Sequence, residues 1–91
     1  MNNTHTYKDR KINYVNELPD SAVVIEQYNN RYEFESLYFH GDVFYVDTGN
    51  GNYRIVPSYM NQGYRKVGLR DIHGVRRVIM CDKLLQQYGL D

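Results

Sequence analysis

Cysteine, tryptophan and long apolar runs are scarce or missing in this 91-residue chain. Cys81 is the single cysteine, so we expect no internal disulfide, no cysteine-based zinc site and a reducing compartment. No apolar run approaches the roughly 20 residues that a membrane helix requires, and the amino-terminal residues MNNTHTYKDRK lack the apolar stretch of a signal peptide. We therefore expect an intracellular protein, in the cytoplasm of a bacterial or host cell, that does not bind membranes.

The net charge is zero, because eleven Lys and Arg residues balance eleven Asp and Glu residues. The balance hides an asymmetry along the chain. Residues 1–50 hold four cations and eight anions, whereas residues 51–91 hold seven cations and three anions. Such opposite halves indicate either an electrostatic partner surface or two halves that neutralise each other across the fold.

Length and composition indicate one globular domain. Hydrophobic residues make up 42% of the chain and charged residues 24%, which are ordinary values for a folded protein. We expect a polar amino-terminal arm over residues 1–20, with one helical turn near 8–15, and a single domain over 21–91. The arm lacks helix or strand periodicity and ends near Pro19, which disfavours helix in the residue before it.

The domain has the pattern of short strands separated by turns that contain Gly, Asn and Asp. The turns around 40–42 and 71–74 would each close a hairpin, the turn at 48–52 leads into another strand, and 58–63 is expected to be a loop. The expected strands are 22–28, 37–39, 43–46, 53–56, 64–70 and 75–80.

A short helix is expected at the carboxy terminus. Asp82 would be its N-cap, the helix would cover 83–88, and Gly89 would end it. Because strands and helices do not alternate, we expect an α+β fold: a small antiparallel sheet of about five strands with two hairpins, and one short carboxy-terminal helix.

Six of the eleven cations gather in residues 63–89. Alternation along 64–70 places Lys66, Gly68 and Arg70 on one face, and the turn register, which the sequence leaves open, decides which arginine of the next strand joins them. A two-stranded basic ribbon can enter a major groove and bind phosphates, and tyrosines can stack on bases; a solvated sheet face is the competing interpretation. The candidate contacts to DNA or RNA are Arg54, Tyr64, Arg65, Lys66, Arg70, Arg76, Arg77 and Lys83.

Catalytic patterns are weak. His5, His40 and His73 have no cysteine companion and no histidine four residues away, so no metal site is expected. Cys81 is interpreted as a small buried residue between a strand and a helix. The GNG at 49–51 has no helix after it to bind a phosphate. We expect no enzymatic activity, no metal and no cofactor.

Two segments resemble the region that precedes the nuclease motif in HNH homing endonucleases of phages and large viruses. FYVDTGNGNYRIV, at 44–56, is similar to the family's YxVSNxGxVRS, and GYRKVGLRDIHGVRRVIMCDKLLQQYG, at 63–89, is similar to GYxxVxLxxxGKxxxxxVHRLVAxAF. The family's Val-His-Arg-Leu is replaced here by residues 80–84, which contain no histidine, and the family's catalytic segment, which follows the helix, has no counterpart. The resemblance implies a non-catalytic module that lies beside DNA, and a phage or viral origin.

The acidic half of the chain favours a different function. It is dense in Tyr and Phe, which suit protein interfaces, and dedicated nucleic-acid binders usually carry a strongly basic balance. The alternative is a protein-binding viral inhibitor, for example of a bacterial or host defence nuclease. A homodimer is also compatible with the sequence, because the edge strands of a small sheet need cover. The candidate protein contacts are Glu26, Glu33, Glu35, Tyr38, Asp42 and Asp47.

Overall fold

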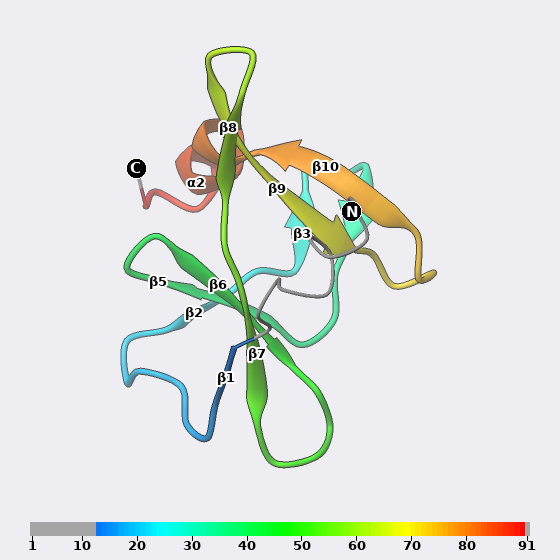
Figure 1. The fold of residues 1–91 in the computed structure, drawn as a ribbon. Coiled ribbons are helices and arrows are strands. Elements are labelled where there is room, and N and C mark those ends of the chain that lie inside the picture. Colours follow the sequence, from blue (N-terminus) through cyan, green and yellow to red (C-terminus); the bar gives the residue numbers. More distant parts are fainter. Residues whose placement is uncertain (1–12, 91) are drawn as a thin grey trace, which may run out of the picture.

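The computed structural model describes residues 13–90, and in that part of the chain it has ten short strands and one helix. The strands pair antiparallel in a sheet of five, a sheet of three and a sheet of two (Figure 1), so the expected fold class is confirmed. The elements are β1 (Tyr14–Val15), β2 (Val23–Val24), β3 (Gln27–Tyr28), β4 (Tyr32–Glu33), β5 (Leu37–His40), β6 (Val43–Asp47), β7 (Tyr53–Val56), β8 (Tyr59–Asn61), β9 (Tyr64–Arg70), β10 (Arg76–Met80) and α2 (Cys81–Gln87).

The five-stranded sheet has the order β1-β7-β6-β5-β2. Its β5–β6 hairpin turns at Gly41 and Asp42, whose φ angles of 55° and 67° suit a type I′ turn, the turn whose twist matches that of the flanking strands. Phe39 and Phe44 are directly opposite each other with ring centroids 4.8 Å apart. Both rings are buried, so this face of the sheet is its core face.

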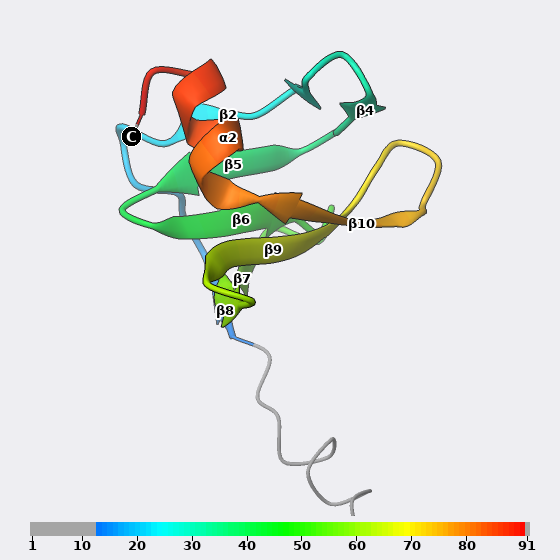
Figure 2. The same cartoon turned by 90° about the horizontal axis from the view of Figure 1, so that it is seen from above.

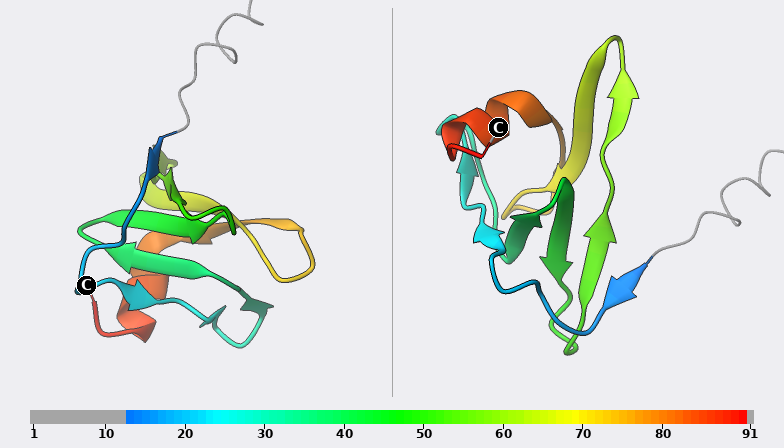
Figure 3. Two further views of the ribbon diagram at one scale, coloured as in Figure 1. Left: turned by 90° about the horizontal axis from the view of Figure 1, so that it is seen from below. Right: turned by 90° about the vertical axis from the view of Figure 1, so that its left-hand side faces the viewer.

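The three-stranded sheet has the order β10-β9-β8. The chain enters it directly from the five-stranded sheet, because β8 follows β7 along one path (Figure 3). Helix α2 continues from β10 and packs against β9 and β10 (Figure 2). All three sheets and the helix contribute to one hydrophobic core, which consists of Ile25, Tyr28, Phe34, Leu37, Phe39, Phe44, Val67, Leu69, Ile79, Cys81 and Leu84.

Two side chains at the end of α2 and directly after it form hydrogen bonds with the backbone of the β3–β4 hairpin. The hydroxyl of Tyr88 accepts hydrogen bonds from the backbone N–H groups of Glu26 and Gln27, at 2.9 and 3.1 Å, and donates to the Gln27 carbonyl at 3.2 Å. The Gln87 side chain accepts from the backbone N–H of Asn29 at 2.8 Å. These bonds satisfy backbone groups of a two-stranded hairpin that would be marginal alone.

The helix begins two residues earlier than expected, at Cys81 and not at Lys83. Met80 is the N-cap, and Asp82 lies in the first turn without a side-chain capping hydrogen bond, so the prediction of an Asp82 cap is wrong. The end at Gly89 is confirmed: its φ is 68°, and the Leu90 N–H bonds to the Leu85 carbonyl at 2.8 Å, the pattern that commonly closes a helix at a glycine.

Two further expectations for the strands are wrong. The expected strand 22–28 is divided between β2 and β3, which belong to different sheets, because the chain bends to bury Ile25 completely. The expected loop 58–63 contains β8, since Gln62 and Gly63, with φ angles of 54° and 80°, close another tight hairpin.

The amino-terminal arm is shorter than expected. Residues 1–12 lie outside the described residues, and with them most of the expected helical turn. The last two residues of that turn form β1 instead, where Tyr14 pairs with Arg54 and Val15 with Tyr53. The sheet therefore begins before residue 21.

Replacing Tyr88 by Phe tests the link between α2 and the β3–β4 hairpin. The variant keeps the ring but leaves two backbone N–H groups without their acceptor, so we expect a loss of about 1–2 kcal/mol in the free energy of unfolding, measured by urea denaturation. Tyr64→Phe is the control, because the Tyr64 side chain is exposed and should lose nothing. Equal stability of the two variants would contradict the link.

Candidate nucleic-acid interface

The outer surface of the three-stranded sheet is basic and aromatic. Directly opposite residues of an antiparallel pair share a face, and the register pairs Arg70 with Arg76, Gly68 with Val78, and Lys66 with both Met80 and Tyr59. The core residues Val67, Leu69 and Ile79 occupy the other face. We call the outer surface the basic face; it consists of Tyr59, Tyr64, Lys66, Gly68, Arg70, Arg76 and Val78.

The register resolves the choice that the sequence leaves open. Arg76, and not Arg77, joins Lys66 and Arg70 on the basic face. Arg70 and Arg76 are directly opposite, and like charges in that position destabilise a sheet. The two side chains reduce this repulsion by extending in opposite directions along the hairpin, Arg76 over Gly68 and Arg70 to the Gly74 carbonyl.

The absence of a side chain at Gly68 leaves room for the side chain of Arg76. A Cβ built on Gly68 would lie 2.6 Å from Arg76 Cζ and 2.8 Å from Nε, which is closer than any side chain can approach. The guanidinium therefore lies over the Gly68 backbone, in the middle of the basic face. A glycine inside a strand often marks such a close approach.

Two cations of the basic face, Lys66 and Arg70, are bonded to neutral groups. Lys66 Nζ donates to Asn61 Oδ1 at 3.0 Å, and Arg70 Nη1 donates to the Gly74 carbonyl at 2.8 Å. In the described part of the chain the one ion pair lies elsewhere, and β8, β9 and β10 contain no Asp or Glu. The face consequently keeps its positive charge.

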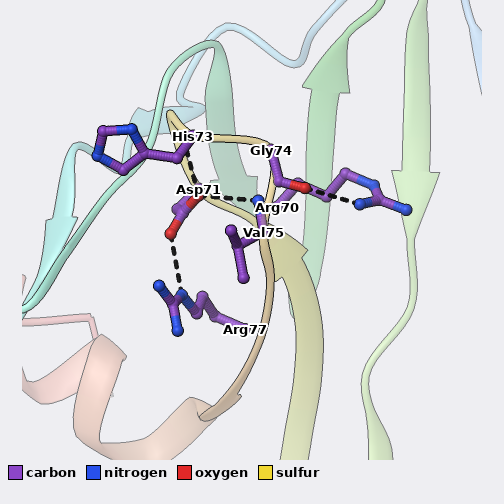
Figure 4. A network of polar contacts seen from close by, with 6 residues as sticks. All are labelled: Arg70, Asp71, His73, Gly74, Val75 and Arg77. Carbon is purple, nitrogen blue, oxygen red and sulfur yellow. Dashed lines mark hydrogen bonds and ion pairs between the residues drawn. The ribbon is translucent and has the colours of Figure 1, made fainter.

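Arg77 extends to the opposite side of the hairpin from Arg70 (Figure 4). Its Nε lies 2.9 Å from Asp71 Oδ2, and its guanidinium lies 4.4 Å from the ring centroid of Tyr32. The Asp71 side chain is 3% exposed and also accepts the backbone N–H groups of His73 and Val75, at 2.9 and 3.0 Å. Arg77 thus stabilises the turn that joins β9 and β10 from its place in β10, on the side of the hairpin opposite to the basic face.

The other predicted cations are dispersed. Arg65 lies on the side of β9 opposite to Lys66 and donates to Ser58 Oγ at 2.9 Å. Arg54 lies in β7 opposite Val46, on the core face of the five-stranded sheet, and Lys83 is exposed on α2. Of the eight predicted contacts, the structure brings together Tyr64, Lys66, Arg70 and Arg76.

Tyr59 belongs to the basic face but is not among the predicted contacts. It is 39% exposed and directly opposite Lys66, but the segment 58–63 was expected to be a loop. The signal was the turn pair Gln62-Gly63, which follows Tyr-Met-Asn and precedes a strand, a pattern typical of a tight hairpin.

The predicted acidic contacts do not form one surface. Tyr38 and Asp47 lie on the outer face of the five-stranded sheet, the face opposite to Phe39 and Phe44. Glu26 and Glu33 line a shallow pocket of about 300 Å³ at the β3–β4 hairpin. Asp42 is exposed in the β5–β6 turn and Glu35 is exposed between β4 and β5.

Groups with chemical reactivity are few in the described residues. Among residues 13–90, no three His, Cys, Asp or Glu side chains come together in a way that could hold a metal ion. Cys81 is 1% exposed in the core, and burial raises the pKa of its thiol, which disfavours the reactive thiolate.

Comparisons with protein-family models, with curated proteins and with solved structures find no match to this chain. No helix within residues 13–90 is long and apolar enough to cross a membrane.

Asp71→Asn tests the turn that sets the register. The Arg77 hydrogen bond is the largest cause that holds the pKa of Asp71 below its ordinary value of 3.8, and the N–H groups of Val75 and His73 act in the same direction against the effect of burial. A lowered folded-state pKa stabilises the protein above the unfolded-state pKa, and this contribution is lost as pH falls through the folded-state value. We expect the variant to be less stable at pH 7 and the difference to shrink below about pH 4, measured by urea denaturation from pH 7 to pH 2.5.

The control for this prediction is Asp42→Asn, in an exposed turn where Asn is equally suited to a positive φ. It should leave the pH dependence of stability unchanged. A constant difference between wild type and Asp71→Asn across the whole pH range would show that the carboxylate charge does not stabilise the turn.

Proposed function

We propose that this chain is a small non-enzymatic protein that binds nucleic acid through the basic face of its three-stranded sheet. The observation that carries the proposal is the register of β9 against β10, which aligns Lys66, Arg70 and Arg76 on one open surface. The same surface carries Tyr64, which is 53% exposed. Cations that bind phosphates and aromatic rings that accept bases are the two components of such interfaces.

Local charge supports this function despite the neutral total. The strands β8 to β10 contain no Asp or Glu, and Arg77 pairs with Asp71 in the adjoining turn. Four further cations of these strands form no ion pair among the described residues: Arg65, Lys66, Arg70 and Arg76. At physiological salt, exposed charges are screened beyond about 8 Å, so a phosphate on the basic face would respond to these neighbours more than to distant acidic residues. A zero net charge is therefore compatible with binding at this face.

The resemblance to modules of phage and viral HNH homing endonucleases favours the same function. Its two segments correspond to the β6–β7 hairpin and to β9, β10 and α2, and the second includes most of the basic face. The resemblance implies a place beside DNA without the nuclease chemistry. It is carried by the two quoted segments alone.

A second candidate function is protein binding by the outer face of the five-stranded sheet. Tyr38 and Tyr45 are directly opposite on this face, next to Ile55, and Tyr38 contacts Tyr53 edge to face with ring centroids 6.1 Å apart. None of these four side chains belongs to the buried core. Partly exposed aromatic side chains gathered on one face are typical of protein interfaces, and such a surface would serve an inhibitor of a defence nuclease.

The double variant Arg70→Ala/Arg76→Ala tests the first function. Binding to labelled DNA and RNA, measured by fluorescence anisotropy at several salt concentrations, should weaken at least tenfold at low salt. The slope of log K against log salt should flatten by roughly 1.4–1.8, the contribution of two phosphate contacts.

A control of equal charge is Arg31→Ala/Lys83→Ala. Both residues are exposed cations outside the basic face, so this variant should keep most of the affinity and the salt slope. Equal losses in the two double variants would mean that net charge, and not the basic face, attracts the nucleic acid. Absence of binding by the wild type at low salt would contradict the proposal and favour the outer face of the five-stranded sheet.

A further inference from the structure

We propose that the ligand of the basic face is single-stranded nucleic acid, whose unpaired bases stack on planar side chains of the sheet. This inference rests on the proposed function and makes it more specific. The surface offers an ordered series of planar groups that are accessible to unpaired bases.

Three planar groups lie in successive rows of the three-stranded sheet. Tyr64 is in the row nearest the β8–β9 turn, Tyr59 lies in the next row opposite Lys66, and the Arg76 guanidinium lies over Gly68 in the row after that. Rows on one face of a strand are about 7 Å apart. The three groups thus extend along roughly 14 Å of sheet, a length over which more than one base can be accepted.

The two tyrosine rings are accessible to a ligand. Tyr59 is 39% exposed and Tyr64 is 53% exposed. Exposed rings of this kind are costly to leave in water and accept the faces of bases, which are open only in unpaired strands. In a duplex the bases are stacked on one another, so the same rings would meet only base edges and sugars.

The sheet is widest in the row of Lys66, where β8, β9 and β10 lie side by side. The row of Tyr64 contains only β8 and β9, and the rows of Gly68 and Arg70 contain only β9 and β10. The rings of Tyr59 and Tyr64 therefore lie at or next to the widest row, and together with the Arg76 guanidinium they form a platform on which a strand can lie.

Cations are placed to bind the backbone of the same strand. Lys66 lies beside Tyr59, and Arg70 lies one row beyond the Arg76 guanidinium. An arginine plane can also stack on a base while its charge attracts the phosphates. The alternation of rings and cations along the face fits a polyanion with one base for each phosphate.

The experiment compares four labelled probes of equal length by fluorescence anisotropy: single-stranded DNA, single-stranded RNA, duplex DNA, and an abasic single strand that keeps the phosphates. We expect both base-carrying single strands to bind at least tenfold more tightly than the duplex or the abasic strand. The two base-carrying probes also distinguish DNA from RNA as the source of the ligand.

Three variants test whether the platform causes this preference. Tyr64→Leu should weaken binding of the base-carrying single strands at least fivefold and leave binding of the abasic strand unchanged, whereas Tyr64→Phe, which keeps the ring, should bind as the wild type. Gly68→Ala keeps every charge but forces the Arg76 guanidinium off the backbone, and it should weaken binding of the base-carrying strands severalfold. Because that guanidinium is the end of a flexible side chain, urea denaturation should show a folded variant of nearly unchanged stability.

The outcomes separate the inference from the proposed function. Salt-dependent binding of equal strength to all four probes, or a preference for the duplex, would overturn the inference and leave nucleic-acid binding by the basic face intact. No binding of any probe would overturn both. An unchanged affinity of Tyr64→Leu for base-carrying strands would also contradict the stacking platform.

Discussion

The candidate interface depends on the hydrogen bonds and the ion pair that the carboxylate of Asp71 forms. This carboxylate accepts the N–H groups of His73 and Val75 within the turn and pairs with Arg77 on the strand that follows. This turn aligns β10 with β9 so that Arg76 lies opposite Arg70, because a shift of one residue would move every side chain to the other face. The ion pair with Asp71 also places the Arg77 guanidinium over the ring of Tyr32. This contact joins the β9–β10 hairpin to β4. One buried carboxylate thus decides which arginine is structural and which is available.

The two sides of the β9–β10 hairpin consequently have different roles: the inner side packs in the core, and the outer side is open to a ligand. On the inner side, Val67 and Ile79 are fully buried in the core, and the positive charge of Arg77 is balanced by Asp71. On the outer side, Arg70 and Arg76 occupy directly opposite positions, and neither forms an ion pair among the described residues. Their charges are available to an anion, which is why the outer side is the proposed site.

Local patterns were sufficient to predict the fold class, the β5–β6 hairpin, the strand 64–70 and the helix end at Gly89. They failed where tertiary structure overrode propensity. The β-branched run 22–28 divides between two sheets because burial of Ile25 in the core outweighs a continuous strand. For the site, alternation alone placed Lys66 and Arg70 on one face, but the choice between Arg76 and Arg77 required the turn register, which depends on the Asp71 hydrogen bonds and has no signature in periodicity.

The most direct test of the central claim is to follow the arginine side chains during binding. In ¹⁵N NMR spectra of the protein, the Nε–Hε signals report each guanidinium separately. Upon titration with a single-stranded oligonucleotide, we predict large shifts for Arg70 and Arg76 and small shifts for Arg77 and Arg54. Shifts concentrated at Arg77 or Arg54, or no shifts at all, would contradict the assignment of the basic face as the binding surface.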